Sequence, residues 1–143
     1  MKTLKQILAS KGGKLVTVAP DDSVFSALQV MAEYNVGAVL VIDKEHLLGI
    51  FSERDYARKV SLLDKSSRDT RVRDIMSDKV LYVTPDQTVD ECMAIMTERH
   101  FRHLPVLDDD HTLLGIVSIG DVVKETISEQ QFIIQQLEKY IAG

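Results

Sequence analysis

The sequence predicts a mixed α/β (α+β) protein made of two βαββα repeats and a C-terminal amphipathic helix. The main observation is an internal repeat: residues 18–24 match residues 83–89 at a shift of 65, which becomes 66 after an inserted residue at Thr112. Of the 40 positions from 16 to 55, 15 are identical in the second copy, against roughly two or three expected from ordinary composition. A unit of this length generally closes its core against its copy, so any site should occur in two related versions.

The elements of each copy follow from apolar spacing. Residues 15–18 predict a short strand, and apolar positions at helical spacing after Ser23 predict a helix. Near-continuous apolar runs at 38–42 and 47–51, on either side of a polar turn, predict two strands that are buried on both faces. The second copy repeats these runs at 104–107 and 113–117, and Thr88 with Glu91 has the form of a capping box at its helix start.

The segments outside the repeated unit are a linker, two lead-ins and a tail. Residues 63–71 are polar and predict a linker, while residues 72–76 parallel residues 4–8 and predict a short helical lead-in to each copy. We therefore expect a first repeat at 4–62, a linker at 63–71, a second repeat at 72–123 and a C-terminal helix at 124–143. The tail helix carries one apolar stripe, formed by Val123, Ile127, Ile134, Leu137 and Ile141.

The stripe has two alternative packing partners, its own domain or a second subunit. We favour subunit association as a homodimer, because two small repeats leave little intramolecular surface to cover it.

Composition excludes several classes of protein. A net charge of -5 and a pI near 5.3, with no basic run, argue against nucleic-acid and membrane-surface partners. The longest apolar run, residues 36–42, is too short to span a bilayer, and residues 1–8 lack the features of a signal peptide. We expect a cytoplasmic protein. The lone Cys92 lies in an apolar helical rhythm, which favours a packed thiol over a nucleophile.

The residues able to do chemistry lie where the last strand of each repeat turns into a helix. Residues 49–55 and 115–121 share the form Gly-h-h-Ser-x-x-Asp, where h is apolar. One interpretation is a capping box that satisfies free helical N–H groups. The other is a ligand site, since strand ends followed by helix starts bind anions and an Asp there can accept two hydrogen bonds from a ribose diol. The two interpretations are compatible.

Taken in order and twice over, the motifs carry a resemblance to a known family. Pro-Asp-x-[Ser/Thr]-Val, the stretch 102–106 (Arg-His-Leu-Pro-Val) and Gly-h-h-Ser-x-x-Asp make the chain resemble a tandem pair of CBS (cystathionine β-synthase) domains from about residue 4 to residue 123. It is similar to the stand-alone bacterial members. The resemblance implies a pseudo-two-fold axis between the repeats, dimerisation, and adenine nucleotides or adenosyl ligands bound in two clefts. It also implies a sensor in regulation, energy sensing or signal transduction.

The resemblance implies a first cleft that combines the Ser-x-x-Asp of the first repeat with the base pocket and cations of the second. Asp55 would hold the ribose and Thr84 the base edge or the sugar. Arg54, Arg102 and His103 would hold the phosphate. The implied residues are Ser52, Arg54, Asp55, Val83, Thr84, Arg102, His103 and Pro105.

The second implied cleft departs from the family pattern. Gly37 and Ala38 stand where the other copy has an Arg and a His, so phosphate binding there needs charge from Lys14 or from a partner subunit. The cleft could hold adenosine, part of a dinucleotide, or nothing. Its implied residues are Thr17, Val18, Val36, Gly37, Ala38, Ser118 and Asp121.

Other chemistries have weaker support. His100 and His103 lie near an acidic turn, but the two groups are at opposite ends of a strand, so no metal site is expected. Glu53, Arg54 and Asp55 have no positioned nucleophile or phosphate loop beside them, so no enzyme activity is expected. Two hypotheses remain: a sensor of AMP, ADP, ATP or NAD that acts through conformation or association on an unidentified protein, and a constitutive structural or interaction module with vestigial clefts.

Overall fold

The computed structural model describes residues 2–12 and 15–142 and divides the chain into two compact units. The first unit joins residues 2–12 to residues 82–142, and the second unit consists of residues 15–81. The predicted mixed α/β class, with two repeated units and a C-terminal helix, is confirmed.

The second unit is a three-stranded sheet with helices packed on it. Its elements are β1 (Thr17–Val18), α2 (Val24–Tyr34), β2 (Ala38–Asp43), β3 (His46–Ser52), α3 (Glu53–Tyr56), a π-helical turn η1 (Ala57–Ser61) and α4 (Val72–Ile75). The strand order is β1-β2-β3, with β1 parallel and β3 antiparallel to β2. Ser23 caps α2 by accepting a hydrogen bond from the Ser26 N–H, as the sequence predicts.

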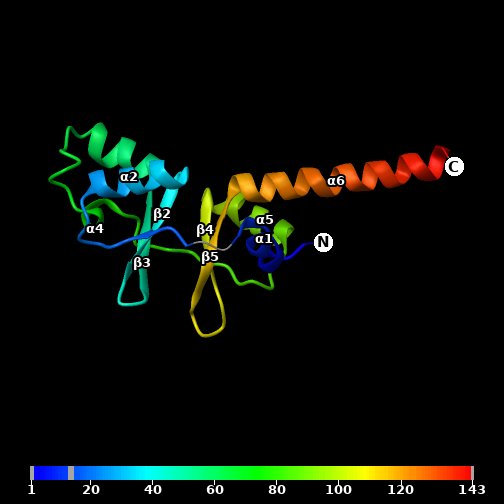
Figure 1. The fold of residues 1–143 in the computed structure, drawn as a ribbon, viewed down its shortest axis with the longest axis horizontal. Helices are drawn as coiled ribbons and strands as arrows, with labels where there is room; N and C mark the ends of the chain where they lie inside the picture. Colours follow the sequence, from blue (N-terminus) through cyan, green and yellow to red (C-terminus); the bar gives the residue numbers. More distant parts are fainter. Residues whose placement is uncertain (1, 13–14, 143) are drawn as a thin grey trace. The chain divides into compact units, whose positions relative to one another are not determined.

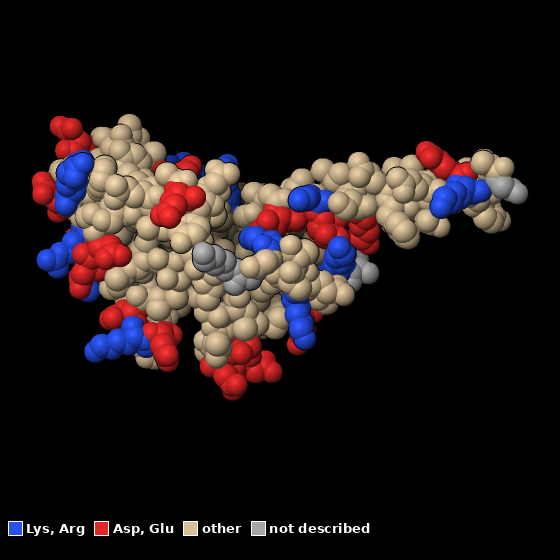
Figure 2. Space-filling view, viewed as in Figure 1, with Lys and Arg blue, Asp and Glu red and all other residues tan. Residues whose placement is uncertain are grey.

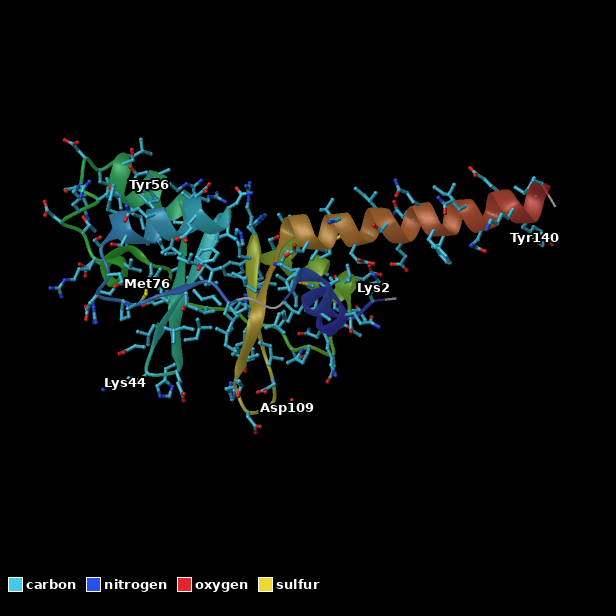
Figure 3. All side chains as sticks on the ribbon, viewed as in Figure 1. Lys2, Lys44, Tyr56, Met76, Asp109 and Tyr140 are labelled. Carbon is cyan, nitrogen blue, oxygen red and sulfur yellow. The ribbon has the colours of Figure 1, made fainter. Side chains whose placement is uncertain are left out.

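The first unit repeats this arrangement around a two-stranded hairpin. Its elements are α1 (Leu4–Lys11), α5 (Val89–Arg99), β4 (His103–Leu107), β5 (Leu113–Ser118) and α6 (Ile119–Ala142). Figure 1 shows α6 running on from β5 past α1 and α5. In Figure 3, Lys44 and Asp109 mark the tips of the β2–β3 and β4–β5 hairpins.

The first strand that the βαββα pattern predicts for the second repeat is reduced to an isolated bridge, and a proline explains the difference. In the first repeat, the Leu40 N–H donates to the Val16 carbonyl beside β1 (3.3 Å). Pro105 occupies the equivalent place in β4 and has no N–H to donate. The ladder there is reduced to one parallel bridge between Val83 and Val106.

The same positions form the core of both units. Val18, Val24, Met31 and Phe51 are buried in the second unit, and their repeat counterparts in the first unit are buried as well. Those counterparts are Val83, Val89, Met96 and Val117. The repeat seen in the sequence is therefore a repeat of core packing.

Each lead-in helix packs on the repeat that it does not begin. At α1, Leu4 N–H donates to the Gln87 carbonyl and Val89 N–H to the Lys2 carbonyl (2.9 and 3.1 Å). At α4, the Val72 N–H donates in the same way to the Asp22 carbonyl (2.9 Å). Each compact unit of the structure thus contains one repeat together with the lead-in helix that precedes the other repeat in the sequence. We call this the exchange of lead-in helices.

The lead-ins also approach the glycine of each Gly-h-h-Ser-x-x-Asp motif. A Cβ atom on Gly49 would lie 2.6 Å from the Ser77 carbonyl oxygen and 2.9 Å from the Met76 sulfur. A Cβ on Gly115 would lie 2.7 Å from a methyl group of Leu8. This motif position is therefore a packing requirement of the fold.

Candidate functional site

The two Ser-x-x-Asp corners have the same geometry. Asp55 Oδ2 accepts hydrogen bonds from the Ser52 N–H and hydroxyl (both 3.0 Å), and the Asp55 N–H donates to Ser52 Oγ (3.1 Å). Asp121 Oδ2 accepts from the Ser118 N–H (2.8 Å), and the Asp121 N–H donates to Ser118 Oγ (3.2 Å). The capping interpretation is therefore confirmed at both corners. Both carboxylates are half-buried at a helix start.

The cation beside each carboxylate comes from a different part of the fold. Lys59 Nζ lies 3.4 Å from Asp55 Oδ1, from one turn further along the same helical segment, and Ser77 Oγ also donates to this oxygen (3.4 Å). At the other corner, Lys11 Nζ of α1 lies 2.7 Å from Asp121 Oδ2 and 3.0 Å from the Ile116 carbonyl oxygen. The two corners are thus alike in backbone geometry and differ in the segment that supplies the lysine.

Lys11, Lys59 and Ser77 are partners of these carboxylates that the motifs in the sequence do not predict. For Lys59 the spacing of four residues from Asp55 was an available signal. Lys11 and Asp121 are 110 residues apart, and no local pattern connects them.

The electrostatics of Asp121 reflect a balance of burial and hydrogen bonding. Burial by itself would raise the pKa of the Asp121 carboxyl, but hydrogen bonds from Lys11 and Ser118 and the Lys11 charge outweigh burial and lower the pKa below its ordinary value. The ionised form of Asp121 is the one that the fold stabilises.

Replacing Lys11 with methionine is expected to raise the pKa of Asp121, because the cation is lost while the burial remains. At pH 7 the free energy of unfolding should fall by about 0.5–1 kcal/mol, since this ion pair is partly exposed to solvent. Because the folded pKa of Asp121 is depressed, the difference between wild type and variant should persist above the unfolded Asp pKa of about 4. It should disappear as the pH falls through the folded value.

NMR titration of the Asp121 carboxyl measures the pKa shift, and urea unfolding at pH 7 and below pH 4 measures the stability. Lys5→Met, at an exposed position of the same helix, is the control for loss of a lysine. An Asp121 titration curve identical in wild type and Lys11→Met would refute the ion pair.

The other predicted residues of the second unit lie around the Ser52 corner. Ala38 pairs with Ser52 across β2 and β3, and the Glu53 N–H donates to the Gly37 carbonyl (3.0 Å). Val36 directly precedes this pair, and Thr17 and Val18 form β1, which is parallel to β2. The Arg54 side chain is exposed.

The predicted residues of the first unit gather around the Ser118 corner in the same way. His103 pairs with Ser118 across β4 and β5, and the Ile119 N–H donates to the Arg102 carbonyl (2.8 Å). The Val83 N–H donates to the carbonyl of buried Pro105 (2.9 Å). The Thr84 N–H donates to the side chain of Gln87 (2.9 Å), and Lys14 lies outside the described residues.

Other candidate groups have structural roles or none. Cys92 is buried in the α5 core, and burial raises the pKa of its thiol to about 11, which suits a packed side chain rather than a nucleophile. Within residues 2–12 and 15–142, no three His, Cys, Asp or Glu side chains are placed to hold a metal ion. No helix in the described part of the chain has the length and apolarity needed to cross a membrane.

These features place the chain in a class of proteins: small, internally duplicated α/β modules with one capped strand-to-helix corner in each copy. A family model for the CBS domain matches residues 5–62 and again residues 72–128. The chain therefore belongs to the CBS-domain family and carries two CBS domains in tandem.

Known proteins agree with this assignment. The mitochondrial CBS domain-containing protein CBSX3 of Arabidopsis thaliana is 39% identical over 150 residues, which cover 99% of this chain and 72% of that protein. A CBS-domain structure from Burkholderia ambifaria MC40-6 is 51% identical, with a TM-score of 0.85 over 90% of this chain and 96% of the other. The structure of CBSX2 in complex with AMP is 26% identical, with a TM-score of 0.72 over 91% and 99% of the two chains.

Proposed function

We propose that this chain is an adenine-nucleotide-binding regulatory module without catalytic activity. AMP, ADP, ATP or NAD is the ligand, and the chain acts by a change of conformation or association on a protein partner. The observation that carries the proposal is the pair of half-buried Asp carboxylates, each held at a capped helix start by contacts with a serine and a lysine.

The chemistry of these corners supports an adenosine ligand. A carboxylate at a helix start can accept both hydroxyl protons of a ribose diol, and the nearby N–H groups favour an anion. Family membership and the AMP complex of CBSX2 support the same ligand class. The Burkholderia relative is described as a candidate signal-transduction protein, which supports a regulatory role.

The proposal keeps the two predicted clefts and their inequality. The first cleft combines Ser52, Arg54 and Asp55 with Val83, Thr84, Arg102, His103 and Pro105. The second combines Ser118 and Asp121 with Thr17, Val18, Val36, Gly37 and Ala38. Lys11, which contacts Asp121, is an additional cation for the second cleft.

The chain acts as a homodimer in the cytoplasm, whereas the name of the Arabidopsis relative places that protein in mitochondria.

Calorimetric titration of the nucleotide-stripped protein with AMP, ATP and NAD tests the proposal, with GMP as the control for the base. We expect saturable binding at micromolar strength and a stoichiometry near one per chain, as unequal clefts require. Absence of binding for all three adenine ligands would favour the constitutive interaction module.

A further inference from the structure

The outer part of α6 is an apolar surface without a cover in its own unit. In α6, all of whose residues are described, Val122 is the single buried residue, and residues 130–142 are all exposed. Ile134 and Leu137 are 53% and 55% exposed. Figure 1 shows α6 extending beyond α1 and α5, and in Figure 2 the face of its outer half that is in view is mostly uncharged. Figure 3 marks Tyr140 close to the end of this helix.

The helix contacts its own unit through a different face. Val122 is fully buried, and Glu125 pairs with Lys2 (3.2 Å) on that side. At 3.6 residues per turn, the row through Val123 and Ile127 lies more than a third of a turn away from this face. Both of these side chains are nearly half exposed, at 44% and 49%. The apolar stripe is therefore accessible along its full length while α6 stays packed on its unit.

The stripe has the seven-residue period of a coiled coil. Ile127, Ile134 and Ile141 recur every seven residues, and Val123, Gln130 and Leu137 form the second row of the same seam. Apolar residues at this period, interrupted by a single polar residue at Gln130, are typical of a coiled-coil seam. In a dimer with a two-fold axis, the same surface of both copies forms the contact, so the stripe of a second copy of the chain can pack against this one.

We propose that α6 forms an antiparallel two-stranded coiled coil with α6 of a second copy of this chain. The residues that flank the seam determine the orientation. One flank is apolar at Ile133 and Tyr140, and the other is charged at Lys124 and Glu138. A parallel pair would place each apolar flank against the charged flank of the other helix, with Ile133 beside Glu138. An antiparallel pair places like flanks together.

The register of the antiparallel pair is the one in which the two seams, each from Val123 to Ile141, overlap along their whole length. Ile127 then faces Leu137 of the second copy, and Val123 faces Ile141. In this register, Lys124 lies beside Glu138 of the second copy, and the two-fold axis repeats the pair. Opposite charges therefore meet twice on the charged flank, which favours this orientation. Gln130 is the polar residue of the seam and lowers the stability of the pair.

The oligomeric state of the full chain tests whether α6 carries the contact. Sedimentation equilibrium should show a dimer at micromolar concentration, and Leu137→Asp should raise its dissociation constant at least tenfold. Gln136→Asp is the matched control, since it adds the same charge to the same turn on a face away from the seam. The inference rests on the proposed homodimer and is independent of nucleotide binding. A dimer that Leu137→Asp leaves intact would refute the α6 contact while leaving the homodimer in place.

Charge reversal tests the orientation. Lys124→Glu and Glu138→Lys should each weaken the dimer about tenfold at low salt, because two attractive pairs become repulsive. The double variant should restore it. In a parallel pair these residues are not neighbours, so the double variant would show no restoration.

Cross-linking gives a second measure of orientation that needs no change of charge. In a Cys92→Ala background, Gln131→Cys lies beside its own copy near the two-fold axis and should form a disulfide-linked dimer. Ile127→Cys should not, because ten residues separate it from its opposite position, about 15 Å along the axis. A cross-link at Ile127→Cys in place of Gln131→Cys would establish a parallel pair and overturn the proposal.

Discussion

Gly49→Ala is expected to lower the free energy of unfolding by about 3 kcal/mol, the largest stability effect we predict for a single methyl group in this chain. The added Cβ would lie 2.6 Å from the Ser77 carbonyl oxygen, which is a backbone atom. Ser77 and Ile50 exchange two backbone hydrogen bonds (2.9 and 3.0 Å), so this strand edge can yield only by breaking them. Urea unfolding followed by circular dichroism measures the loss.

The repeat supplies a matched control for this substitution. Gly115→Ala should cost about 1 kcal/mol, because its added methyl group meets the end of the Leu8 side chain, which can rotate away. Leu8→Ala should relieve part of the clash at Gly115→Ala. Met76→Ala should not rescue Gly49→Ala, since the Ser77 carbonyl stays in place. Equal costs at the two glycines would contradict the backbone contact at Gly49.

The interior of each unit could be predicted from the sequence because the repeat preserves core positions. The predicted helix after Ser23 and the strands after Gly37 are present, and the buried residues of one copy coincide with those of the other. The shortened first strand of the second repeat follows from the absent N–H of Pro105. The loss of this strand depends on which residue pairs with Pro105, and apolar spacing does not determine the register between two strands.

The exchange of lead-in helices lay beyond sequence reasoning for a physical reason. Residues 4–8 and 72–76 have the same pattern, so local preferences are equal whichever repeat they contact. The choice is made by tertiary hydrogen bonds such as Leu4 N–H to the Gln87 carbonyl. The ion pair of Lys11 with Asp121 is a consequence of the exchange, and it could not be predicted without it.

The candidate site shows what a motif alone leaves open. Ser-x-x-Asp fitted both a helix cap and a ribose site, and the structure confirms the cap at both corners. At Asp55 the cap uses Oδ2, while Ser77 and Lys59 contact Oδ1, so a ribose diol would have to displace these two longer contacts (both 3.4 Å). The ligand role proposed for Asp55 and Asp121 is therefore tested by a binding measurement and is independent of their role in the caps.

Asp55→Ala is expected to weaken AMP binding tenfold to hundredfold, because it removes charge-assisted hydrogen bonds to the ribose worth about 1.5–3 kcal/mol. The same substitution removes the acceptor of the Ser52 N–H and some stability with it. Calorimetry at 25 °C, after circular dichroism has established that the variant is folded, separates the loss of affinity from a loss of structure.

Glu91→Ala is the matched control, because Glu91 occupies the same third position of a capped helix and lies outside both proposed clefts. It contacts the Thr88 hydroxyl (3.3 Å) as Asp55 contacts the Ser52 hydroxyl (3.0 Å). We expect Glu91→Ala to lower stability and leave AMP affinity unchanged. Equal affinity of wild type, Glu91→Ala and folded Asp55→Ala would mean that the Asp55 carboxylate serves the helix alone, and the ribose would then have to be held elsewhere. A loss of affinity confined to Asp55→Ala would assign the carboxylate to the ligand, because both variants lose an acid that contacts the capping hydroxyl and only one loses the site.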